Sequence, residues 1–137
     1  MFDPTKITDN LVESAKLVIG VLDKLRAAKK QHRNDIADLF GKIGDCLVAV
    51  SSEIRMGNVP SGKCGEIITY AEELPKLIRK DVGKKKADEI GDTLHSAYNV
   101  ERLAIDIKNV ADKEPYLRSI EEASGKFNAF ANILRVG

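Results

Sequence analysis

The stretch GNVPSGKC, residues 57–64, has the residue types and spacing of a nucleotide-binding phosphate loop except at its last position. Such a loop reads G-x-x-x-x-G-K-[ST]; its backbone amides hold the phosphates and its final hydroxyl binds Mg²⁺. Cys64 stands where that hydroxyl would be, and a thiol is a poor ligand for so hard a cation. The preceding segment DCLVAVSSEIRM continues a helical pattern rather than a buried strand. We therefore predict a turn between two helices and no nucleotide-binding site.

The two cysteines are the next candidates for chemistry. Cys64 follows Lys63 at the start of a predicted helix, where the helix dipole and the cation favour a thiolate. It is the best candidate for a reactive group, although no partner base is evident. Cys46 falls between Ile43 and Leu47 on an apolar stripe, which predicts a buried structural thiol. Two cysteines in this arrangement indicate neither a disulfide framework nor a zinc site, and they favour a reducing, cytoplasmic location.

Arg26 and His32 are spaced as R-x5-H, which resembles the R-x(4–6)-H motif of HEPN ribonucleases, a family of helical bundles. The resemblance implies that His32 acts as a general acid or base and that Arg26 contacts phosphate. The alternative is a basic helix end, where Lys29, Lys30 and His32 complement the helix dipole. This spacing is common in helices, so we favour the second interpretation and assign no catalytic residue.

No metal or cofactor site is predicted. Metal-binding bundles of the di-iron type use Glu-x-x-His motifs, and neither Glu72-Glu73 nor Glu121-Glu122 has that spacing. We expect both acidic pairs to lie on solvated helix faces. His95 lies beside Leu94 on an apolar stripe, which predicts a partly buried structural histidine.

The densest basic stretch is Lys84-Lys85-Lys86, with Arg79 and Lys80 just before it. Asp81, Asp88 and Glu89 dilute this charge, and no aromatic side chains interleave to stack on bases. Over the whole chain, 22 basic and 21 acidic residues give a formal net charge of +1. We therefore expect no nucleic-acid partner and no electrostatic attraction to an anionic membrane.

The elements that position these residues are predicted to be helices throughout. Apolar residues recur at alternating steps of four and three, which is the period of one buried helix face. No apolar run is long enough to span a membrane. The 137 residues are enough for one domain, 1–137, which is either complete or the N-terminal part of a longer protein. The stripes cover residues 11–25, 36–54, 67–78, 90–107 and 120–134.

Turn signals separate the stripes. AKKQHRND is either a short turn or a continuous exposed helix surface. RMGNVPSG contains glycine, asparagine and proline, and Ser61 is predicted to cap the next helix. Pro75 either kinks that helix or divides it into two, and Gly83 is suited to its C-terminal end. The predicted fold class is all-α, an antiparallel bundle of four to five helices.

The run RNDIADLFGKIGDCLVAVSSEIRMGNVPSGKCGEIITYAEELP resembles the N-terminal helical domains of bacterial multidomain signalling and defence proteins, known as effector-associated or death-like adaptor domains. YNVERLAIDI and EEASGKFNAFANILRV extend the resemblance over most of the chain. It implies a non-catalytic module that binds a partner protein or forms homo-oligomers through its helix faces. The alternatives are a HEPN-like ribonuclease that uses Arg26 and His32, and a small-ligand sensor with a pocket between helices.

Overall fold

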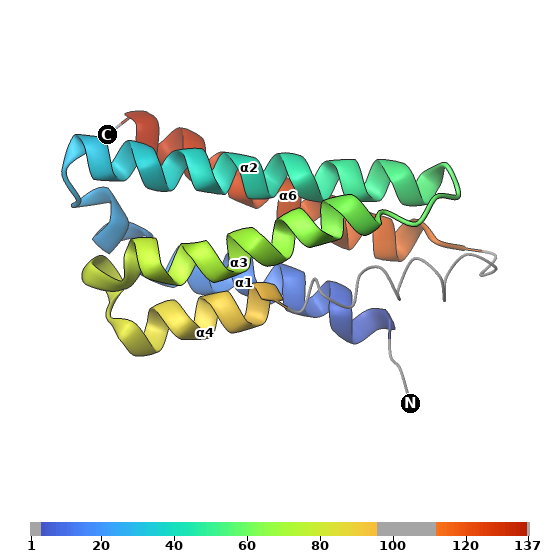
Figure 1. Cartoon of the computed structure of the whole chain (residues 1–137), viewed down its shortest axis with the longest axis horizontal. Helices are drawn as coiled ribbons and strands as arrows, with labels where there is room; N and C mark the ends of the chain where they lie inside the picture. Colours follow the sequence, from blue (N-terminus) through green and yellow to red (C-terminus); the bar gives the residue numbers. More distant parts are fainter. Residues whose placement is uncertain (1–3, 96–111, 137) are drawn as a thin grey trace.

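The computed structural model describes residues 4–95 and 112–136, and it is all-α in these ranges (Figure 1). The described residues form five helices, and no strand occurs among them. The helices are α1 (Pro4–Arg26), α2 (Lys30–Arg55), α3 (Ser61–Val82), α4 (Lys84–His95) and α6 (Glu114–Val136). The part of the predicted fourth helix that follows His95 lies outside the described residues. None of the described helices is long and apolar enough to cross a membrane.

Described helices that a short turn joins run antiparallel, whereas α1 and α6 lie side by side with the same direction (Figure 1). Along α2 and α6, Arg55 pairs with Glu114 near one end, and Asp38 pairs with Arg135 near the other. α2 packs most extensively against α6, and α3 packs most extensively against α4. α1 contacts α6, α4 and α3 (Figure 1). The predicted antiparallel helical bundle is therefore confirmed.

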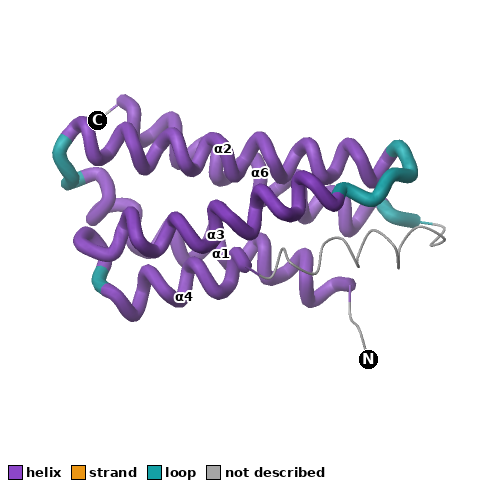
Figure 2. The backbone as a smooth tube through the Cα atoms, in the orientation of Figure 1, coloured by secondary structure: helices purple, strands orange, loops and turns teal. Residues whose placement is uncertain are grey.

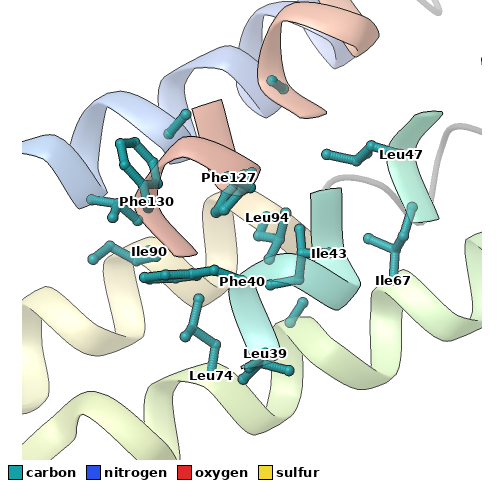
Figure 3. Packing of buried hydrophobic residues seen from close by; sticks show 14 of the residues in the cluster. Leu39, Phe40, Ile43, Leu47, Ile67, Leu74, Ile90, Leu94, Phe127 and Phe130 are labelled. Carbon is teal, nitrogen blue, oxygen red and sulfur yellow. The ribbon is translucent and has the colours of Figure 1, made fainter. Parts of the chain in front are cut away.

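One apolar core fills the space between the helices. The described parts of the predicted stripes point inward, and Phe40, Phe127 and Phe130 meet near the middle of the core (Figure 3). The ring centroid of Phe40 lies 5.7 Å from that of Phe127 and 5.9 Å from that of Phe130. The planes of Phe127 and Phe130 are inclined by 82°, an edge-to-face arrangement that aromatic pairs favour. Ile90 and Leu94 of α4 surround the same region (Figure 3).

Two glycines allow helix axes to approach closely. A methyl group at Gly91 of α4 would lie 2.3 Å from Cγ of Pro75 and 3.1 Å from the carbonyl oxygen of Ala71. α3 continues through Pro75 from Ser61 to Val82, so the proline does not divide the helix. Its ring packs into the space that Gly91 leaves. On α2, a methyl group at Gly44 would lie 2.7 Å from Cγ of Asn128, and the Gly44 carbonyl accepts a 2.6 Å hydrogen bond from the hydroxyl of Ser124.

The described loops are short and lie at the two ends of the bundle (Figure 2). A short turn of residues 27–29 joins α1 to α2, and the remainder of AKKQHRND, residues 30–35, forms the first turns of α2. Gly57 and Gly83 have φ angles of 82° and 88°, which side chains with a Cβ rarely adopt. The prediction that Ser61 caps α3 was wrong. Pro60 occupies the N-cap position, no side chain caps the helix there, and Ser61 is already helical.

Arg33 ties the end of α6 to the turn between α1 and α2. Its Nε donates to the carbonyl oxygen of Leu134 at 2.8 Å, and its Nη1 donates to the carbonyl oxygen of Ala28 at 3.1 Å. Carbonyls in the last turn of a helix have no partner within the helix, so these bonds replace contacts with water. The end of the bundle that carries this turn is thereby fixed against the C-terminal end of α6.

Candidate functional site

The stretch GNVPSGKC covers the connection from α2 to α3, as predicted, and its last four residues, SGKC, form the first turn of α3. α2 ends at Arg55, and the residues before Gly57 are helical rather than part of a strand. Lys63 pairs with Glu66 through Nζ and Oε2 at 3.1 Å, and this hydrogen bond raises the pKa of the lysine. The lysine of a phosphate loop must instead be available to the phosphates. The local geometry is that of a helix–turn–helix connection.

Both cysteines are buried. This confirms the prediction for Cys46, and it argues against Cys64 as an accessible reactive thiol. Cys64 is in the first turn of α3, but only 2% of it is exposed because it begins the buried stripe of that helix. The thiol of Cys46 donates to the carbonyl oxygen of Lys63 at 3.3 Å. Burial, with a smaller contribution from the charge of Glu66, raises the pKa of the Cys46 thiol to about 11. The raised pKa therefore disfavours the thiolate form of Cys46, and burial restricts the access of reagents to both thiols.

We expect both thiols to react slowly with a disulfide reagent such as Ellman's reagent at pH 7. A buried thiol reacts only when the structure opens, and the raised pKa lowers the thiolate fraction at Cys46 further. Labelling of Cys46→Ala and Cys64→Ala variants follows each thiol separately, and urea-unfolded protein gives the reference rate. If Cys64 in the folded chain reacts at a rate close to that reference, it is an accessible thiol and this description of it is wrong.

Arg26 and His32 lie on different sides of the turn between α1 and α2. Arg26 lines a groove with Leu22 and residues of α6, whereas His32 lines a hollow against α3. The Nε2 atom of His32 is 2.8 Å from Oδ2 of Asp81, so its ring is held by α3. The ribonuclease interpretation requires Arg26 and His32 to line a common pocket. They line different ones.

The other polar candidates lie on solvated faces or in ion pairs. His95 is half-exposed, and its Nε2 lies 3.9 Å from Oε1 of Glu72. Lys84 pairs with Asp88 at 3.3 Å, and Lys86 pairs with Glu89 at 3.3 Å. Within residues 4–95 and 112–136, no group of three His, Cys, Asp or Glu side chains is placed to hold a metal ion. The acidic residues thus neutralise much of the basic stretch, as the sequence indicated.

An apolar surface that the sequence analysis did not identify lies between the C-terminal halves of α1 and α6. Leu22, Arg26, Ile133 and Val136 line one groove there. Val136 is 87% exposed, and Ile19, one turn before Leu22 on the same face of α1, is 52% exposed. We call these five residues the α1–α6 face. A large apolar side chain normally gains free energy by leaving water, so this cluster on the surface marks a candidate interface.

Comparison with protein-family models, with curated proteins and with solved structures finds no match for this chain. Its function has to be inferred from the arrangement of its own residues.

Proposed function

We propose that this chain is a non-catalytic protein-interaction module that self-associates through the α1–α6 face. One observation carries the proposal: exposed apolar side chains of α1 and α6 lie close together. They are Ile19, Ile133 and Val136, beside Leu22. The resemblance of residues 33–75 to helical adaptor domains supports the same role, in a bacterial signalling or defence protein.

A second copy of the chain is the occupant that the chemistry of this face favours. In a two-fold dimer each surface meets its own counterpart, so an apolar surface is complementary to itself. The alternative occupant is an amphipathic helix of another protein, and the experiment below separates the two.

We expect sedimentation equilibrium to give a concentration-dependent mass that approaches that of a dimer. Ile19→Lys places a charge in the interface, where its desolvation has no compensating partner, so the dissociation constant rises by at least about tenfold. The matched control is Val48→Lys, because Val48 is also a β-branched residue of a helix surface and is 46% exposed. This control should change the dissociation constant by less than about twofold.

A native chain that stays monomeric throughout the concentration series would contradict self-association. If Val48→Lys weakens the dimer as much as Ile19→Lys does, the α1–α6 face is not the interface.

A further inference from the structure

A basic hollow lies between the α1–α2 turn and the last two turns of α3. Its volume is about 620 Å³, within the range of small-molecule sites. Three lysines line it: Lys29 from the turn, and Lys76 and Lys80, which are one turn apart on α3. The side chain of Leu77 and two alanines of the turn contribute an apolar side.

Among the described residues, the three lysines of this basic hollow form no ion pair, although Lys76 also lines an adjoining hollow that contains Asp35, Asp38 and Glu73. In the part of the chain that the structure describes, the lysine ion pairs do not include Lys29, Lys76 or Lys80. One carboxylate, that of Asp81, lines the hollow, and it is engaged at 2.8 Å by the Nε2 atom of His32. By contrast, two of the three lysines at the start of α4, Lys84 and Lys86, have acidic partners at 3.3 Å.

Three ammonium groups around one hollow repel one another, and a multivalent anion between them removes that repulsion. Lysine binds phosphate as a point charge with three donors, so such an arrangement suits phosphate oxygens. Lys29 is also the N-cap residue of α2, and no side chain caps that helix end. The positive end of the helix dipole therefore adds to the field of the lysines.

We propose that the basic hollow binds a small phosphorylated molecule carrying at least two negative charges. The phosphates contact the three lysines, and the remainder of the molecule lies against Leu77. None of the residues of the α1–α6 face lines this hollow. Ligand binding and self-association are therefore independent proposals, and either can fail without the other.

The test is calorimetric titration of the whole chain with inorganic pyrophosphate at about 0.15 M salt, where long-range attraction is largely screened. We expect saturable binding that Lys76→Gln/Lys80→Gln weakens by at least about tenfold, because two charged donors are lost. The matched control, Lys16→Gln/Lys24→Gln, removes the same charge from exposed sites outside the hollow and should change the affinity by less than about twofold. Circular dichroism verifies that both variants fold.

Absence of saturable pyrophosphate binding would overturn the proposal. An equal loss in the two double variants would also overturn it, since the attraction would then follow net charge alone. ADP and soluble inositol trisphosphate, titrated in the same way, distinguish a nucleotide from a lipid headgroup as the source of the phosphates. Tighter binding of either one supports the proposal and identifies which organic part the apolar side accepts.

Discussion

Phe127→Ala is expected to lower the free energy of unfolding by about 3–5 kcal/mol, because it removes a fully buried ring and leaves a cavity. The ring contacts Phe40 and Phe130 from two directions, so neither neighbour can close the space without losing its own packing. A loss of this size is a large fraction of the total stability of a small domain, which is about 5–15 kcal/mol. Urea denaturation followed by circular dichroism measures it.

Two controls accompany this variant. Phe127→Leu retains most of the volume and should cost less than Phe127→Ala, by an amount that reports on the aromatic contacts. Val48→Ala, at an exposed site on α2, should change the stability by about 0.5 kcal/mol or less. If Phe127→Ala costs no more than Val48→Ala, the aromatic cluster is not the centre of the core.

Gly91→Ala is expected to destabilise the chain by about 1–3 kcal/mol, although alanine normally favours a helix. The added methyl group would lie 2.3 Å from Cγ of Pro75 and 3.1 Å from the carbonyl oxygen of Ala71, so α3 and α4 must move apart. Gly65→Ala is the matched control, because Gly65 is a helical glycine of α3 with open space around it. That variant should gain about 0.5–1 kcal/mol.

A double-mutant cycle distinguishes this contact from a general intolerance at position 91. Pro75→Ala removes the ring atom nearest to the new methyl group, so Gly91→Ala should cost less in that background by at least about 0.5 kcal/mol. Urea denaturation of the four proteins gives the coupling energy. If Gly91→Ala stabilises the chain as Gly65→Ala does, the close approach of α3 and α4 is wrong.

Helical periodicity was sufficient to predict most of the fold. The stripe of residues 36–54 predicted α2 because every fourth or third residue is apolar, and all of those positions are buried. Cys64 could have been placed correctly from the same signal, since it precedes Ile67 by three residues and Ala71 by seven. The cap of α3 was misassigned because Pro60 takes the N-cap position, which puts the Ser61 hydroxyl inside the helix.

The candidate sites depend on which helices pack against each other. The hydrophobic period of the sequence predicts helices but not which of them become neighbours. Pro75 does not divide α3, and the packing of its ring against Gly91 of α4 could not be predicted from the sequence. His32 and Asp81 are 49 residues apart, and the register of α2 against α3 brings them together. The exposed residues of the α1–α6 face likewise gather only because the two helix ends are adjacent.

The central claim is that the α1–α6 face joins two copies of this chain, and amide chemical shifts recorded on dilution test it most directly. The account predicts that the amides of residues 19–26 and 132–136 shift as dimers dissociate, while those of α2 near Val48 stay constant. In Ile19→Lys, the dilution-dependent shifts of residues 132–136 should occur at concentrations at least about tenfold higher than in the native chain. Spectra that do not change on dilution, or changes confined to α2 and α3, would contradict the account.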